Sequence, residues 1–309
     1  MMSRYLDPKA DIVFKKIFGD HPKLLISFLN AVLPLLSPIV ELFYLPTEQI
    51  PSIPAFKRTI ADVKCWDANG RIFIVEMQMN WTDSFKQRLL FGTSQAFVKQ
   101  LEQGKEFKLL QPVYGLGIVA EIYEKTSPDW YHHYQLVKKD TAKQDIIEHL
   151  QLIFIELPKF PVHSPDEKKL RLLWLRFLRE IDEHTKTVSQ ELLDIPEIAE
   201  AIALSEEAAY TPAELEVYEG YWDQVSREKS LIADKYAEGE AQGIAKGKAE
   251  GKAEGKAEGK AEGEVIGIAK GKANEKLDVA KKLIKLGVSI DTIVEVTGLS
   301  QAEIVAIIE

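Results

Sequence analysis

The sequence has a single cysteine, Cys65, among its 309 residues. A lone cysteine excludes an intrachain disulfide and any zinc site built on cysteines. Long apolar runs are also missing: the most apolar early stretch, residues 28–45, contains Pro34, Pro38 and Glu41 and is too broken to span a membrane. The N-terminus lacks the basic stretch and apolar run of a secretory signal. These absences predict a cytoplasmic protein with no membrane partner.

An excess of basic residues is lacking as well, since the formal net charge is −9. Strong nucleic-acid binders usually carry clear basic patches. The charge is distributed unevenly, however. Residues 1–110 hold 14 Lys or Arg and 11 Asp or Glu, which leaves 25 basic and 37 acidic residues for the remainder. The first third of the chain is therefore compatible with a nucleic-acid substrate, and the acidic excess lies outside it.

The apolar pattern of the first 160 residues predicts a sheet covered by helices. Helices are expected between residues 8 and 19, at 22–32 and at 83–103, where Asp83 would be the N-cap. Residues 46–57, with three prolines, are expected to form an extended loop. Strands are expected at Thr59–Trp66, Arg71–Met79, Pro112–Ile122, Trp130–Val137 and Gln151–Leu157. This order predicts a mixed α/β (α+β) sheet flanked by helices.

Composition divides the chain into four expected segments: a sheet domain at 1–160, a helical lobe at 161–235, a repeat at 236–274 and a small helical module at 275–309. The repeat is of the type Gly-Lys-Ala-Glu and holds nine of the 18 glycines. Glycine weakens a helix while Ala, Lys and Glu favour one. The repeat therefore predicts a weak helix or linker, with self-association into a homo-oligomer as the alternative.

The last segment carries the signals of a helix-turn-helix. Gly298 marks a turn, and Ser300 with Glu303 matches a capping box. The second helix, residues 301–309, has no Lys or Arg, so DNA phosphates would repel it. A small protein-interaction or dimerising module is favoured over a DNA reader.

A hairpin between residues 59 and 79 places acidic residues in one of two registers. A two-residue turn at 69–70 would set Asp62 opposite Met77, whereas a three-residue turn at 68–70 sets Asp62 opposite Glu76. The side chains favour the three-residue turn, because it gathers the apolar residues on one face: Ala61, Val63, Cys65, Phe73, Val75 and Met77. The opposite face then carries Asp62, Lys64, Glu76 and Gln78. Gly70 tolerates the left-handed backbone that such a turn requires.

Two opposed carboxylates on a hairpin have a simple chemical consequence. Directly opposed side chains lie roughly 5 Å apart, and carboxylates that close repel each other unless a cation separates them. Hard divalent cations such as Mg²⁺ or Mn²⁺ take oxygen ligands. Asp62 and Glu76 are therefore candidate metal ligands; the alternative is that both are solvated surface charges.

The same residues carry a family resemblance. An Asp on one strand followed by Glu-x-Lys or Glu-x-Gln on the next resembles the PD-(D/E)XK nuclease superfamily, and this chain has Asp62 and then Glu76-Met77-Gln78. The opening Asp7-Pro8-Lys9, with Asp11, Phe14 and Lys15, and the later Arg88 resemble the Rpn-type recombination-promoting nucleases and transposases of that superfamily. The likeness covers residues 4–235, and the repeat is similar to tails seen in the group.

The resemblance implies a restriction-endonuclease-like fold and a role for each residue. Asp62 and Glu76 would ligate one or two metal ions, with the Met77 carbonyl as a further ligand. Gln78 stands where the superfamily usually has lysine and would orient the attacking water, while Lys64 would supply the missing charge. Asp11 would be an additional acid beside the metal, and Arg88 would contact a DNA phosphate.

Two functional hypotheses follow. The first is a Mg²⁺-dependent DNA endonuclease of the recombination-promoting, transposase-like type. The second is a catalytically weak nuclease fold that acts as a DNA-binding or regulatory protein, and Gln78 in place of lysine motivates it. His132 and His133 are not expected to share a metal, because neighbouring residues of a strand point to opposite faces.

Overall fold

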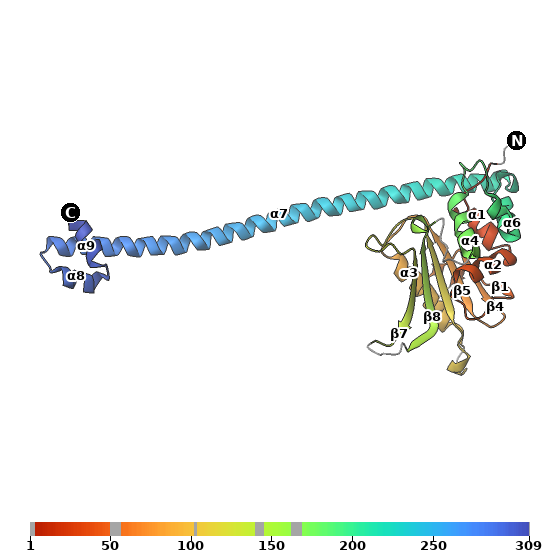
Figure 1. Cartoon of the computed structure of the whole chain (residues 1–309), viewed down its shortest axis with the longest axis horizontal. Helices are drawn as coiled ribbons and strands as arrows, with labels where there is room; N and C mark the ends of the chain where they lie inside the picture. Colours follow the sequence, from red (N-terminus) through yellow and green to blue (C-terminus); the bar gives the residue numbers. More distant parts are fainter. Residues whose placement is uncertain (1–3, 50–56, 102–103, 140–144, 162–168, 309) are drawn as a thin grey trace. The chain divides into compact units, whose positions relative to one another are not determined.

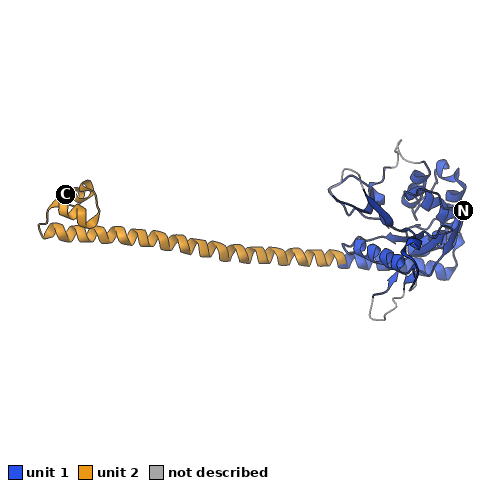
Figure 2. Cartoon of the chain, turned by 90° about the horizontal axis from the view of Figure 1, so that it is seen from below, with its two compact units in different colours: residues 1–231 blue, residues 232–309 orange. Residues whose placement is uncertain are grey.

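Figure 1 shows the computed structural model of the chain, which describes residues 4–49, 57–101, 104–139, 145–161 and 169–308. Contacts divide the chain into two compact units, Met1–Leu231 and Ile232–Glu309 (Figure 2). The boundaries expected near residues 160 and 235 remain predictions. Of the helices in the described ranges, none combines the length and the apolar character that a membrane crossing needs.

A six-stranded mixed sheet forms the centre of the first unit, with the strand order β1-β4-β5-β6-β8-β7. Strands β5, β6 and β8 run parallel, and β1, β4 and β7 run antiparallel to their neighbours. The strands are β1 (Leu42–Tyr44), β4 (Val63–Asp67), β5 (Ile72–Gln78), β6 (Val113–Val119), β7 (Tyr131–Val137) and β8 (Ile146–Glu156). Every residue of β6 is buried, as expected for a strand covered on both faces. The mixed α/β sheet predicted from the sequence is confirmed.

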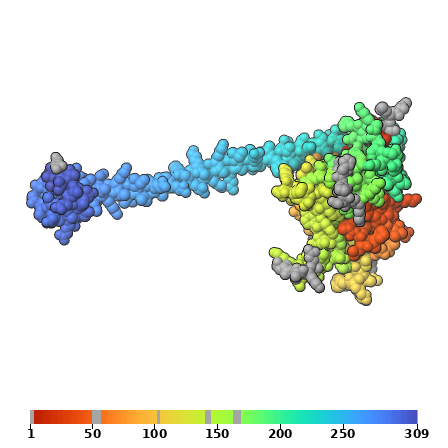
Figure 3. Space-filling view, in the orientation of Figure 1, coloured from red at the N-terminus to blue at the C-terminus, as the bar shows by residue number. Residues whose placement is uncertain are grey.

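Helices cover both faces of this sheet. One face packs against α1 (Asp11–Phe18), α2 (Pro22–Val32), α4 (Lys169–Glu180), α5 (Gln190–Leu193) and α6 (Pro196–Leu204). The side chains of the N-terminal helices and of the segments after residue 169 adjoin each other at the surface (Figure 3). Helix α3 (Phe85–Val98) covers the other face. Short 3₁₀ turns lie at η1 (Phe107–Leu109), η2 (Leu157–Lys159) and η3 (Glu207–Ala209).

The hairpin between β4 and β5 has the three-residue turn. Val63 pairs with Val75 and Cys65 with Phe73, so the predicted register is confirmed. Gly70 has a φ of 79°, in the left-handed region. The Asp67 carboxylate holds the turn, because it accepts hydrogen bonds from the backbone of Asn69 (3.0 Å) and Arg71 (2.9 Å) and from the Arg71 guanidinium (2.8 Å).

The prediction of one continuous strand at Thr59–Trp66 is wrong. Thr59–Ile60 forms β3, which pairs with β2 (Glu48–Gln49) in a separate two-stranded sheet. The chain bends at Ala61, whose backbone N–H donates to the Thr47 carbonyl (3.2 Å) instead of to β5. Ala61 therefore packs with Ile74 and Phe85 under α3, not with the apolar face to which the sequence pattern assigned it.

Other boundaries also differ from expectation. Helix α3 begins at Phe85 after Ser84, so Asp83 is not its N-cap. Strand β8 begins at Ile146, because its first residues pair with the end of β7. Strand β1 lies in the stretch 28–45, where no strand was predicted. Residues 50–56 of the expected loop lie outside the described residues, and Glu48–Gln49 is strand.

Helix α7 (Pro212–Lys285) begins in the first unit and continues into the second. The whole Gly-Lys-Ala-Glu repeat is helical, and every residue from 233 to 276 is solvent-exposed. The end of α7 packs with α8 (Ile290–Thr297) and α9 (Gln301–Ile308) through Ala280, Ile293 and Ile304. The expected capping box is present: the Glu303 carboxylate accepts from the Ser300 backbone N–H (2.8 Å) and hydroxyl (2.6 Å).

Candidate active site

The point where β4 and β5 separate is marked by Asp62. In a continued ladder the Met77 backbone N–H would donate to the carbonyl of Ala61, which has turned away. Asp62 Oδ2 accepts this hydrogen bond instead, at 2.6 Å. The Asp62 side chain is half-buried. If the register of β4 and β5 were extended by one residue, Asp62 would lie opposite Glu76. The end of the hairpin pairing therefore fixes the position of this carboxylate.

Glu76 lies on β5 and is buried, with 7 % of its surface exposed. Its neighbour on β6 is Gly117, where an added Cβ would lie 3.0 Å from the rings of both Phe154 and Phe85. A glycine here lets α3 approach the sheet closely. The approach brings Nε of Arg88, on α3, to 3.5 Å from Oε2 of Glu76.

The Gln78 side chain, two residues further along β5, is engaged at both ends. Its Oε1 accepts a hydrogen bond from Nη2 of Arg88, and its Nε2 donates to the carbonyl of Asn80 at 2.5 Å. The buried amide of Asn80 in turn donates to the Val225 carbonyl (2.9 Å) and to Oε2 of Glu228 (3.2 Å), both on α7. A chain of polar contacts thus runs from Glu76 through α3 to α7.

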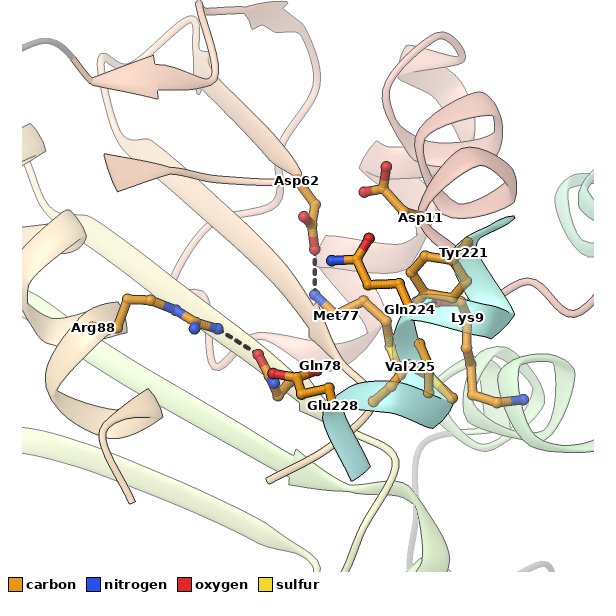
Figure 4. A pocket seen from close by; sticks show the side chains of 11 residues that line it. Lys9, Asp11, Asp62, Met77, Gln78, Arg88, Tyr221, Gln224, Val225 and Glu228 are labelled. Atoms are coloured by element: carbon orange, nitrogen blue, oxygen red, sulfur yellow. Dashed lines mark hydrogen bonds between the residues drawn. The ribbon is translucent and has the colours of Figure 1, made fainter. Parts of the chain in front are cut away.

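A pocket of about 310 Å³ opens beside these residues (Figure 4). Its lining includes five residues singled out from the sequence: Asp11, Asp62, Met77, Gln78 and Arg88. The first turns of α7 contribute Tyr221, Gln224 and Glu228. The sequence offers no signal for these α7 residues, because they lie about 145 positions after the hairpin and carry no motif.

The two remaining candidates, Glu76 and Lys64, do not line the pocket. Glu76 contacts Arg88, which does line it. The Nζ of Lys64 donates to Oε1 of Gln49 at 3.2 Å, and burial, with a smaller contribution from Lys99, lowers the pKa of Lys64. Asp11 lies in the pocket wall with its carboxylate 2.7 Å from Nζ of Lys15. The structure therefore brings together Asp11, Asp62, Glu76, Met77, Gln78 and Arg88, but not Lys64.

The electrostatics of the two central carboxylates reflect their crowding. Burial, helped by the charge of Asp11, raises the pKa of Asp62 to about 6, against the opposing effects of the Met77 N–H, Lys15 and Arg88. Burial, helped by the charge of Asp62, raises the pKa of Glu76 to about 7, against the effect of Arg88. The charge of the Asp62 carboxylate therefore disfavours ionisation of Glu76, as expected for a neighbouring acid.

The side chains at this site offer a metal ion mainly carboxylate and amide oxygen atoms. Within the described ranges no group of three or more His, Cys, Asp or Glu residues is arranged to hold a metal. Asp62, in the pocket wall, and Glu76, in contact with Arg88, still fit a hard divalent cation that takes its other ligands from water and a substrate phosphate. His132 and His133 bond to different residues, Glu156 (2.8 Å) and Gln151 (2.9 Å).

Comparison with known proteins identifies the family of the chain. No curated protein and no solved structure shows significant similarity to the chain. A protein family described as PD-(D/E)XK nuclease family transposase matches residues 8–235, which include the hairpin, α3 and the first turns of α7. Rpn-type recombination-promoting nucleases are members of this family, and PD-(D/E)XK nucleases generally use divalent metal ions. The chain belongs to the PD-(D/E)XK nuclease family transposases.

Proposed function

We propose that this protein is a metal-dependent DNA endonuclease of the recombination-promoting, transposase-like type. The observation that carries the proposal is the placement of two acids at one pocket: Asp62, just before β4, lines it, and Glu76, on β5, contacts Arg88, which lines it too. Family membership supports nuclease chemistry on DNA.

Asp62 and Glu76 would hold Mg²⁺ or Mn²⁺, with the backbone carbonyl of Met77 as a further ligand. Carboxylate and carbonyl oxygens are the donors that these cations prefer. When bound, the cation supplies charge neutralisation at the scissile phosphate and a lowered pKa for water. Asp11 would act as the additional acid of the site, kept in the pocket wall by its ion pair with Lys15.

The reaction is a hydrolysis that needs no further reactant. The oxygen of a water molecule bonds to phosphorus, and the bond from phosphorus to the leaving nucleotide oxygen breaks. One proton of the water is released and one is taken up by the leaving oxygen. The products are one phosphate monoester end and one hydroxyl end. Arg88, partly exposed in the pocket, would contact the phosphate.

Plasmid cleavage tests this function. Wild-type protein is expected to cut DNA with Mg²⁺ or Mn²⁺ and not with EDTA, and Asp62→Ala is expected to lose the activity. Glu106→Ala is a matched control, because Glu106 is an exposed acid paired with Lys108 outside the pocket. Equal cleavage by wild type and Asp62→Ala would remove the proposed site.

One observation favours a second function, a nuclease fold that binds DNA or regulates a partner without turnover. Position 78 holds glutamine, which cannot carry the charge of the usual motif lysine. Isothermal titration with Mg²⁺ or Mn²⁺ separates the two functions. Metal binding that disappears in Glu76→Gln supports the nuclease, whereas no binding to the wild type supports the second function.

The exposed tail is the proposed surface for self-association. A lone helix with a glycine at every fourth position gains no tertiary contacts of its own, since an added Cβ at each repeat glycine meets nothing within 4 Å. Close helix–helix contact through these small residues would form a homo-oligomer. Sedimentation velocity of the full chain is expected to show association that rises with concentration. The combined substitutions Gly251→Leu, Gly255→Leu and Gly259→Leu are expected to weaken this association, and a monomer at all concentrations would contradict it.

A further inference from the structure

The side chain of Gln78 is already committed within the protein. Its amide nitrogen donates to the Asn80 carbonyl and its amide oxygen accepts from Arg88, and only 9 % of the residue is exposed. A buried amide held at both ends has one orientation. Its visible effect is to hold the guanidinium of Arg88 in a fixed place.

Three residues contact the side chain of Arg88, and part of it remains exposed to solvent. Gln78 binds Nη2, Glu76 lies 3.5 Å from Nε, and the guanidinium carbon lies 4.9 Å from the centre of the Phe85 ring. The side chain is nevertheless 46 % exposed and lines the pocket. A guanidinium has five N–H donors, so contacts with one amide and one carboxylate leave donors for a phosphate.

The other cations near the pocket are used elsewhere. Lys9 lines the pocket, but its Nζ lies 2.7 Å from the Asp7 carboxylate and donates to the Leu178 carbonyl. Lys15 pairs with Asp11, and Lys64 donates to Gln49 outside the pocket. Among the described residues that line this pocket, Arg88 is the cation placed beside the central carboxylates.

We propose that Arg88 is a catalytic residue that supplies, from α3, the positive charge that the motif lysine would supply from position 78. Gln78 is then a positioning residue that holds Arg88 next to Glu76. Negative charge builds up on the phosphoryl oxygens as water bonds to phosphorus and the bond to the leaving oxygen breaks, and a fixed guanidinium stabilises that charge. The inference rests on the proposed nuclease function.

Steady-state cleavage of a duplex with Mg²⁺ tests the inference through kcat and KM measured separately. Arg88→Ala is expected to lower kcat by about 10²-fold or more, with KM changed by less than about threefold, because the charge acts on the transition state. Arg88→Lys is expected to keep more activity than Arg88→Ala. The double variant Gln78→Lys with Arg88→Ala is expected to regain kcat to within about tenfold of wild type, since lysine returns the charge to the motif position.

Lys86→Ala is the matched control, because it removes one cation from the same first turn of α3 at a side chain that lies over the Tyr123 ring and outside the pocket. Its kcat is expected to stay within about threefold of wild type. Thermal unfolding of each variant shows whether it is folded. If the wild type cleaves DNA and Arg88→Ala is equally active, this inference is overturned and the proposed function stands. The same holds if the double variant is no more active than a folded Arg88→Ala. Wild type without cleavage in any divalent metal overturns the proposed function and this inference with it.

Discussion

The carboxylate of Asp62 accepts a hydrogen bond from the backbone N–H of Met77, with 2.6 Å between the two atoms. This contact ends the β4–β5 pairing and places the acid in the pocket wall at the same time. The residue that the sequence predicts as a metal ligand therefore also ends the pairing of β4 with β5. Substitutions can separate its charge from its hydrogen bond to Met77.

Asp62→Asn is expected to keep the bond to Met77, because the amide oxygen still accepts, while losing the charge that would hold a metal. Asp62→Ala is expected to lose both, at a cost of about 1 kcal/mol in the free energy of unfolding. Urea unfolding and metal titration measure the two effects. Metal affinity that survives in Asp62→Asn would show that this carboxylate is not a ligand.

The stability of the metal-free protein is expected to depend on pH through Glu76. The pKa of Glu76 rises from 4.5 in a free chain to about 7 in the fold. The raised pKa contributes to the free energy of unfolding in full below about pH 4.5, where Glu76 is protonated, and this contribution is lost as pH rises through 7. Glu76→Gln mimics the protonated form. Its unfolding free energy relative to wild type, measured in EDTA, is expected to increase from pH 4.5 to 8 by up to about 3 kcal/mol. A difference that does not change with pH would contradict the raised pKa.

Asn80 is expected to hold the start of α7 against the site. Asn80→Ala removes the donors to Val225 and Glu228 and is expected to cost about 1–3 kcal/mol in unfolding free energy, because Asn80 is buried. Asn80→Asp is expected to lower the unfolding free energy further, since it places a second carboxylate next to that of Glu228. Amide hydrogen exchange of residues 221–229 is expected to be faster in both variants. Unchanged exchange would show that Asn80 does not restrain α7.

Gly117 is expected to control the distance between α3 and Glu76. In Gly117→Ala the new methyl group would lie 3.0 Å from two aromatic rings, which is expected to cost about 1–3 kcal/mol and to move Arg88 from Glu76. Gly220→Ala, on α7, is the control, because nothing lies within 4 Å of its added Cβ and alanine favours a helix. Urea unfolding and DNA cleavage compare the two. Equal stability and cleavage in both variants would rule out the close packing at Gly117.

Local pattern was enough to predict much of the first unit. The alternation of apolar residues, with glycine at position 70, determined the hairpin register, because a slip of one residue would have set Asp62 opposite Met77 and mixed polar with apolar side chains on each face. Helix α2 begins and ends where the sequence predicts, since Pro22 suits a first turn and the apolar stripe ends at Val32. The capping box at Ser300 depends on residues three positions apart and was equally visible.

Tertiary structure decided what local pattern could not. Ala61 continues the alternation of β4, yet its backbone N–H bonds to Thr47, and Asp62 accepts the hydrogen bond from Met77 instead. Lys64 shares a predicted face with Asp62, but its Nζ donates a hydrogen bond to Gln49, outside the pocket. The pocket wall from α7 meets the end of the hairpin through a hydrogen bond between Asn80 and Val225, 145 positions apart. Sequence periodicity reports which face of an element is apolar, whereas the partner of a polar group is set by which distant segments pack beside it.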